Sequence, residues 1–192
     1  MKKIGITGGI GSGKTTVCKI FEILNIPIYY ADDRSKWLIN NNEYIINKLK
    51  LNFGDDIYVE NILDRKKLAF IVFNNSVKLN ELNSIVHPFV QSDFEEWCEL
   101  QTESKYVLKE AALLFESGSY KCLDLTINVV APLAERIKRV KERDGSTEIE
   151  IINRINKQWS DNEKLKICDL VIYNNNNLSL IHQVLRINKL II

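Results

Sequence analysis

The chain has 192 residues, which is enough for one domain with a substantial core and too few for two ordinary domains. Its 45% of hydrophobic and 27% of charged residues are typical of soluble globular proteins. The net charge of +1 gives no overall field that would favour nucleic acid or an acidic membrane surface as a partner. Any basic binding site must therefore be local.

Targeting and redox signals are weak throughout the chain. No stretch approaches the roughly 18 consecutive apolar residues that a membrane-spanning helix needs. The apolar run after the two N-terminal lysines is short and broken by glycine and threonine, unlike a secretory signal. The four cysteines are widely spaced and include no Cys-x-x-Cys pair, which argues against a disulfide framework or a zinc site. These features predict a cytoplasmic protein without a membrane partner, and none of them predicts an oligomeric state.

Short apolar runs alternate with amphipathic stretches of helical length, the pattern of a parallel sheet covered by helices. In chain order, residues 3–7 predict a first strand, residues 14–24 the helix after it, and residues 27–30 a short second strand. From Asp32 to about residue 100 the pattern is mostly helical. This is more than one crossover between strands requires, so we expect an inserted helical region at residues 33–100.

The second half of the chain returns to the alternating pattern. Residues 106–109 and 125–130 predict strands, each followed by a helix. Residues 133–143 predict a basic helix that ends at Asp144-Gly145, because glycine favours the left-handed conformation after a helix.

A second helix is expected after the basic one. Ser146 or Thr147, followed by Glu148 and Glu150, predicts a capped start, and the helical pattern runs to about Trp159. We then expect a last strand and a closing helix, with loops at the two asparagine runs. These segments are residues 170–173 and 178–189 for the strand and helix, and 40–42 and 174–177 for the loops.

The segment GGIGSGKT, residues 8–15, fits the pattern G-x-x-x-x-G-K-[ST] at every fixed position. Its glycines allow successive backbone N–H groups to turn inward on an anion, and the following helix adds its positive N-terminal end. Lys14 is expected to reach the β- and γ-phosphates, and the Thr15 hydroxyl to bind Mg²⁺. The alternative is a glycine-rich turn that binds nothing, but the flanking strand and amphipathic helix favour a nucleoside triphosphate.

Motifs beyond this loop resemble the dephospho-CoA kinases in order and spacing over nearly the whole chain. They are YADDRSKWL, LDRKKLAFIVF, LNSIVHPFV, LLFESGSY, ERIKRVKERDGST, NRINKQ and CDLVIYNN. The resemblance implies a single kinase domain, 1–192, of α/β class with the three-layer P-loop NTPase fold. Its parallel sheet should have about five strands, with a helical substrate-binding insert and a basic lid at 136–158. The implied reaction is transfer of the γ-phosphate of ATP to the ribose 3′-hydroxyl of dephospho-CoA, the last step of coenzyme A synthesis.

The resemblance assigns the catalytic base to Asp32. The family carries Asp-Ala-Asp here, and its second aspartate accepts a proton from the ribose hydroxyl. This chain has Tyr30-Ala31-Asp32, so the base is kept and the first acid is replaced by tyrosine. The position just past the second strand is where open α/β sheets place their ligands. The alternative interpretation of Asp32 is a helix N-cap. Asp33 is the less favoured base and could cap the same helix.

Three further residues match family positions and are candidates for contact with the substrate. Glu110 ends the third strand, where a carboxylate could hold a Mg²⁺ water or orient the acceptor; a structural ion pair is the alternative. His87 lies in the pattern L-N-x-x-x-H-P, although a lone histidine beside proline is usually structural. Arg65 matches a family arginine that could meet substrate phosphate, and would otherwise be a surface charge near a helix start.

The basic helix is the expected lid. A run of basic residues is usually a solvated face, but a transferring phosphoryl group needs a positive clamp, and P-loop kinases supply arginines from a lid. Of the run, Arg139 and Arg143 match the family best. On the next helix Arg154 and Gln158 are four residues apart and so share a face, and both match the family. The run comprises Arg136, Lys138, Arg139, Lys141 and Arg143.

These assignments define the expected site, with ATP as co-substrate, Mg²⁺ as cofactor and dephospho-CoA as the small-molecule partner. The catalytic set is Asp32, Lys14 and Arg139, and Thr15 is the metal ligand. The acceptor set is Asp32, Arg65, His87, Glu110 and Gln158. The nucleotide set is Gly9, Gly11, Ser12, Gly13, Lys14, Thr15, Thr16, Arg143 and Asn174, the last near the adenine.

Two other functions remain open at the level of sequence. Another P-loop kinase of a nucleoside monophosphate or metabolite would share the loop and lid, but would not need the long helical insert. A nucleotide-gated switch would recognise guanine through N-K-x-D, and no Asn-Lys pair of this chain has aspartate two residues later.

Overall fold

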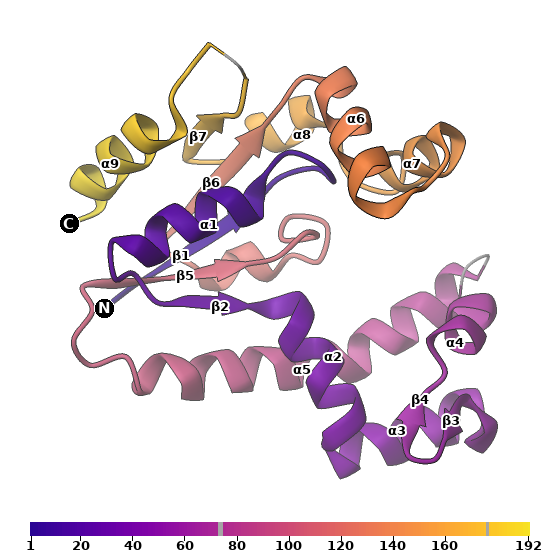
Figure 1. The fold of residues 1–192 in the computed structure, drawn as a ribbon. Coiled ribbons are helices and arrows are strands. Elements are labelled where there is room, and N and C mark those ends of the chain that lie inside the picture. Colours follow the sequence, from indigo (N-terminus) through magenta and orange to yellow (C-terminus); the bar gives the residue numbers. More distant parts are fainter. Residues whose placement is uncertain (73–74, 176) are drawn as a thin grey trace. The chain divides into compact units, whose positions relative to one another are not determined.

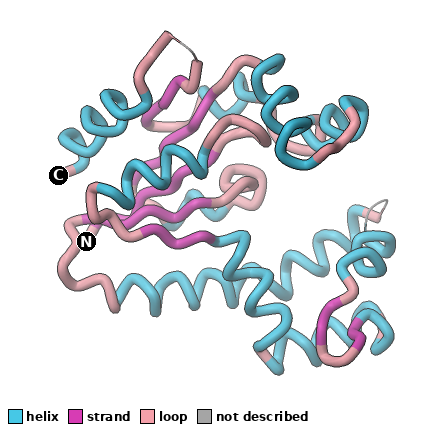
Figure 2. The backbone as a smooth tube through the Cα atoms, in the orientation of Figure 1, coloured by secondary structure: helices cyan, strands magenta, loops and turns pink. Residues whose placement is uncertain are grey.

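The structure is a computed structural model that describes residues 1–72, 75–175 and 177–192. The chain forms two compact units: residues 1–30 with 101–192 make the first, and residues 31–100 make the second. The course of the chain through both is drawn in Figure 1, and Figure 2 shows the distribution of helix and strand.

The first unit is built on a five-stranded sheet with the strand order β2-β5-β1-β6-β7. All neighbouring strands are parallel, and β1 lies at the centre between β5 and β6. The expected parallel sheet of about five strands is therefore confirmed. Its members are β1 (Lys2–Thr7), β2 (Ile28–Tyr30), β5 (Tyr106–Glu110), β6 (Leu125–Val130) and β7 (Leu170–Tyr173).

Helices pack on this sheet and close its core. In Figure 1, α1 lies in front of the sheet and α8 behind it. The core joins Ile4 and Ile6 of β1 to Phe21 of α1 and Val184 of α9, all fully buried. The helices of this unit are α1 (Lys14–Ile23), α6 (Leu133–Asp144), α7 (Glu148–Ile155), α8 (Asp161–Leu165) and α9 (Leu180–Ile191), with the short 3₁₀ turn η2 (Ser119–Cys122).

The expected signals at the ends of the lid helices are confirmed. Helix α6 ends at Gly145, which has the left-handed φ of 65°. Helix α7 begins with a capping box, in which Thr147 accepts from the Glu150 N–H and the Glu150 side chain accepts from the Thr147 N–H.

The expected extension of this second helix to Trp159 is wrong, because α7 ends at Ile155. A second capping box, formed by Ser160 and Glu163, begins α8 only five residues later. The Trp159 and Ser160 N–H groups donate to the carboxylates of Glu116 and Glu163 instead of to carbonyl oxygens one turn earlier, so the backbone has left the helix before α8 begins. Gln158 therefore lies in the connection between two helices.

The second unit is a helical cluster with its own core. Buried Leu38, Ile45, Leu49 and Leu68 bring three of its helices together. The elements are α2 (Ala31–Asn41), α3 (Glu43–Phe53), η1 (Asp55–Ile57), β3 (Tyr58–Val59), β4 (Ile62–Leu63), α4 (Arg65–Val72) and α5 (Ser76–Glu99).

Two features of this unit differ from expectation. The loop expected at residues 40–42 is wrong: α2 continues to Asn41, and Asn42 is the N-cap of α3, accepting from the Ile45 N–H. An antiparallel hairpin, β3–β4, interrupts the helices. Its turn residues Glu60 and Asn61 both have positive φ, the requirement of the tight turn that matches strand twist.

None of the helices, within the part of the chain that the structure describes, is long and apolar enough to cross a membrane.

Candidate active site

The glycine-rich loop follows β1, the central strand, and ends where α1 begins. Gly11 and Gly13 have φ of 76° and 94°, a conformation that a residue with a Cβ rarely adopts. Gly13 is also the N-cap of α1, and no side chain of the described residues caps this helix end. The backbone N–H groups of the first turn are thus left for an anion.

Lys14 lies at this helix end with its amine directed to the loop. Its Nζ donates to the Gly8 carbonyl oxygen at 2.9 Å and lies 4.0 Å from Glu110 Oε1. Glu110 is the last residue of β5 and is in register with Ile6 of β1, so the sheet places the two charges together. Both side chains are 12% exposed. A positive group and an acid therefore face each other at the carboxyl edge of the sheet.

The fit of this loop to a phosphate with Mg²⁺ depends on groups around the helix end. The Ser12 hydroxyl is buried and makes no hydrogen bond to any described residue. Thr15 and Thr16 are exposed in the first turn of α1, so their hydroxyls are accessible to a ligand. In P-loop proteins a Ser or Thr hydroxyl at this position binds Mg²⁺ together with phosphate oxygens and waters. The hydroxyls of Ser12 and Thr15 and the first-turn N–H groups of α1 therefore fit a phosphate with Mg²⁺.

Side chains from the far half of the chain hold the outer side of the loop. Arg136 Nε donates to the Ile10 carbonyl oxygen at 2.9 Å, and Gln158 Oε1 accepts from the Ile10 N–H at 2.8 Å. Asn174 Nδ2 donates to the Ser12 carbonyl oxygen at 2.8 Å. The predicted residues Gln158 and Asn174 therefore contact the loop, and their contacts with acceptor and adenine stay predictions.

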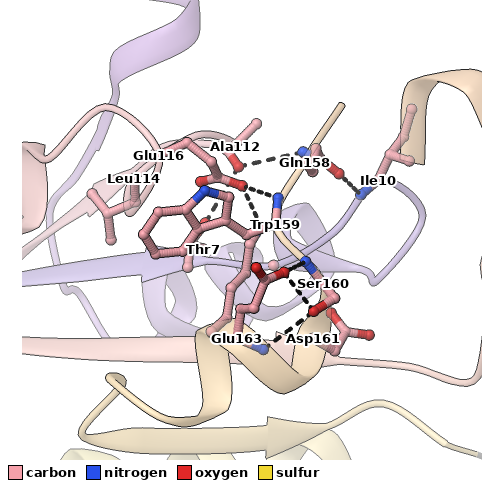
Figure 3. A network of polar contacts seen from close by, with 12 residues as sticks. Thr7, Ile10, Ala112, Leu114, Glu116, Gln158, Trp159, Ser160, Asp161 and Glu163 are labelled. Carbon is pink, nitrogen blue, oxygen red and sulfur yellow. Dashed lines mark hydrogen bonds and ion pairs between the residues drawn. The ribbon is translucent and has the colours of Figure 1, made fainter. Parts of the chain in front are cut away.

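The sequence suggested that Arg154 and Gln158 share a helix face, but in the structure they do not. Arg154 Nη1 donates to Asp144 Oδ2 at 3.1 Å, at the C-terminal end of α6. Gln158 instead joins the loop to the sheet edge, where its Nε2 donates to the Ala112 carbonyl oxygen at 3.4 Å (Figure 3). The cause is the end of α7 at Ile155, which removes the helical spacing on which the expectation rested.

The two lid arginines singled out by sequence have different surroundings. Arg139 Nη1 lies 3.5 Å from the Gly11 carbonyl oxygen and 30% of the side chain is exposed. Arg143 is more exposed and makes two hydrogen bonds to Asp144, which raise the pKa of the guanidinium. The same pair lowers the pKa of Asp144. Arg139 is thus beside the loop, and Arg143 is held by its own neighbour.

The second unit carries three of the predicted residues. Asp32 is the second residue of α2 and is exposed, so its alternative interpretation as an N-cap is wrong: the helix already begins at Ala31. Asp33 is also inside the helix and pairs with Lys36 at 2.5 Å. Arg65 is the exposed first residue of α4, and His87 is exposed in α5.

Sequence reasoning missed the role of Arg136, which it placed in a run of five basic residues. Arg136 is only 6% exposed, and its Nη1 donates to Asp161 Oδ2 at 3.0 Å. A signal was available: Val140, one helical turn later, is apolar, so positions 136 and 140 define the inner face of an otherwise basic helix.

Known proteins resemble this chain along most of its length. A sequence profile described as dephospho-CoA kinase matches residues 2–179. A protein of Bacteroides fragilis named dephospho-CoA kinase is 35% identical over 185 residues, covering 96% of this chain and 90% of the relative.

Solved structures agree with this likeness. A dephospho-CoA kinase from Campylobacter jejuni has a TM-score of 0.70 at 28% identity, over 97% of this chain and 95% of that one. A crystal structure from Thermus thermophilus has a TM-score of 0.89 at 34% identity, over 98% and 96% of the two chains. The P-loop kinase fold expected from sequence is thereby confirmed.

Proposed function

Because this chain belongs to the dephospho-CoA kinase family, it phosphorylates dephospho-CoA with ATP, and we propose that it does so with the residues assembled around the glycine-rich loop. The single observation that carries the assignment of the site is the end of α1. There the left-handed Gly13 begins the helix without a side-chain cap, so the first-turn N–H groups are open to phosphate, and the Lys14 amine lies beside them. We propose the cytoplasm as its location, because ATP supplies the phosphoryl group.

The loop binds the triphosphate in this proposal. First-turn N–H groups of α1 donate to phosphate oxygens, and Lys14 moves from the Gly8 carbonyl to neutralise the β- and γ-phosphates. The Thr15 hydroxyl would hold Mg²⁺, which would supply charge neutralisation to the γ-phosphate. Phosphoryl transfer needs positioning and electrostatic stabilisation more than covalent help, and these groups supply both.

Asp32 is the proposed base for the 3′-hydroxyl of the acceptor. The support is its match to the family position and its place in the chain, two residues after Tyr30 ends β2. Tyr30 pairs in register with Glu110 at the carboxyl edge of the sheet, where open α/β sheets bind their ligands. Asp33 is the less favoured candidate, because it matches the family's base position less well and its carboxylate pairs with Lys36. Glu110, Arg65 and His87 are proposed to bind and orient the acceptor.

The proposed substrate is tested by measuring ADP formation with a panel of acceptors. Dephospho-CoA is expected to be turned over efficiently, and AMP, shikimate and pantothenate poorly, because the family motifs extend over the whole chain and not only over the loop. Equal or better turnover of any of these three would contradict the proposal and indicate another small-molecule kinase. Slow hydrolysis that no acceptor accelerates would indicate a nucleotide-gated switch.

The lid arginines are expected to act on the transition state. Arg139→Ala should lower kcat by about tenfold or more while ATP affinity changes little, because its partner charge develops during phosphoryl transfer. Arg143→Ala should have the same sign of effect. Steady-state kinetics and nucleotide binding separate the two quantities, with exposed Lys138→Ala on the same helix as the control. Wild-type kcat in both arginine variants would make Arg139 and Arg143 surface charges without a role in catalysis.

A further inference from the structure

The first and last residues of the expected lid region, 136–158, contact the same residue of the phosphate loop. Arg136 Nε donates to the Ile10 carbonyl oxygen, and Gln158 Oε1 accepts from the Ile10 N–H, at 2.9 and 2.8 Å. The two bonds engage both backbone polar groups of one residue in the middle of the loop. We call this pair of contacts the Ile10 clasp, formed by Arg136 and Gln158.

The Arg136 half of the clasp is rigid and closely packed. Its guanidinium is fixed by two partners, Ile10 and the Asp161 carboxylate at 3.0 Å, and only 7% of the side chain is exposed. A Cβ on Gly9 would lie 2.1 Å from Arg136 Nη2, so the guanidinium lies directly against the loop. A Cβ on Gly11 would lie 2.5 Å from the Arg136 carbonyl oxygen. Helix α6 therefore approaches the loop as closely as glycine permits.

The Gln158 half lies at the other end of the lid and is held by the segment that follows β5. While its oxygen accepts from Ile10, its Nε2 donates to Ala112 just after β5 (Figure 3). The N–H of the next residue, Trp159, donates to Glu116 Oε1 at 2.8 Å, and the same oxygen lies 3.0 Å from the fully buried Lys164 amine. The segment that follows the lid is thus fastened to the segment after β5.

We propose that Arg136 and Gln158 are positioning residues, which fix the loop at Ile10 for phosphate binding and fix the lid ends relative to that loop. Neither residue needs to touch ATP, and this role of Gln158 stands in place of the acceptor contact expected from sequence, because both ends of its amide are engaged by Ile10 and Ala112. Gln158 occupies the Ile10 N–H, so the phosphate is left to the N–H groups at the start of α1. Arg139 follows Arg136 by three residues, so the clasp also sets the place from which that arginine acts. This proposal rests on the proposed function only for the role of the lid.

The experiment compares Arg136→Met and Gln158→Leu with the wild type. Each variant should lower kcat/KM for ATP by about tenfold or more, since small misplacements of reacting groups are costly. Each should also weaken binding of a non-hydrolysable ATP analogue, measured by calorimetry without acceptor. The KM for dephospho-CoA should stay within about twofold. Arg136→Lys should be intermediate, because an ammonium on a flexible stem cannot reproduce the fork that reaches Ile10 and Asp161.

Controls separate positioning from loss of stability. Lys138→Met removes an exposed charge from the same helix and should leave kinetics and analogue binding unchanged. Asp161→Asn should weaken analogue binding when it is made alone. When it is combined with Arg136→Met it should add little, because Asp161 acts through the Arg136 guanidinium. If Arg136→Met does not fold, Gln158→Leu carries the test, since it leaves no buried charge unpaired.

Two results would overturn the proposal. Analogue affinity and kcat/KM for ATP within about twofold of the Lys138→Met control, with only the melting temperature lowered, would make the clasp purely structural. A KM for dephospho-CoA that rises as much as that for ATP would place these residues on the acceptor. Analogue binding needs no acceptor, so a wild type that fails to phosphorylate dephospho-CoA would refute the proposed function and leave this test intact.

Discussion

Asp32→Asn is expected to lower kcat by roughly a hundredfold or more, the usual scale for losing a general base. Asparagine has the size of aspartate but cannot accept the proton of the ribose hydroxyl as the phosphoryl group transfers. Binding of ATP and dephospho-CoA should remain, because the change preserves shape. Kinetics and both substrate affinities are the measurements that test the assignment.

Stability should change little in this variant. Asp32 is an exposed residue in the first turn of α2, so its charge interacts favourably with the helix dipole by about 0.3–1 kcal/mol. Asp33→Asn is the matched control, since it removes a neighbouring carboxylate that is paired with Lys36. It should be much milder in kcat. A larger loss of kcat in Asp33→Asn than in Asp32→Asn would identify Asp33 as the base. If neither variant lost kcat, Glu110 would be the next candidate to test.

Lys14→Ala is expected to lower kcat/KM by on the order of a hundredfold or more, about 3 kcal/mol of transition-state stabilisation. The amine lies beside the loop's own backbone, 2.9 Å from the Gly8 carbonyl oxygen, and alanine leaves that position without a positive charge. The fold should persist, because the helix and strand that flank the loop are packed through other residues. Steady-state kinetics and thermal melting test both statements.

Lys19→Ala is the matched control for this change, because Lys19 is exposed on the same helix and outside the loop. It should leave both kinetics and melting temperature close to those of the wild type. Full activity of Lys14→Ala would be incompatible with phosphate binding at the end of α1. A variant that fails to melt cooperatively would show instead that the pair with Glu110 contributes to the fold.

Local patterns were predicted well where the chemistry is itself local. The glycines and lysine of the loop, the left-handed Gly145 after α6 and the capping box at Thr147 all lie within a few residues of the groups they satisfy. Their partners are fixed by spacing along the chain, so the sequence contains the whole interaction. The buried strands were recognised for a related reason, because a strand covered on both faces is a continuous apolar run.

Patterns failed where two local preferences competed. Asparagines at 40 and 41 were expected in a loop but lie in α2, where the Nδ2 of each donates to a carbonyl oxygen one turn earlier. The helix expected to about Trp159 ends early, because the Trp159 and Ser160 N–H groups donate to the carboxylates of Glu116 and Glu163 instead of continuing the helical hydrogen bonds. The β3–β4 hairpin carries Glu60 at its turn, which gives a weak signal for positive φ.

The sequence by itself determined the phosphate loop, the parallel sheet that carries it and the family to which the motifs point. Val140 indicates the inner face of α6, but only the tertiary structure decided what the basic residue on that face contacts. The five basic residues of α6 are chemically alike, and Arg136 differs because the docking of α6 against the loop buries that side chain alone among them. Its partners, Ile10 and Asp161, are 126 and 25 residues away along the chain. Contacts across such separations depend on how elements pack, and no local spacing specifies them.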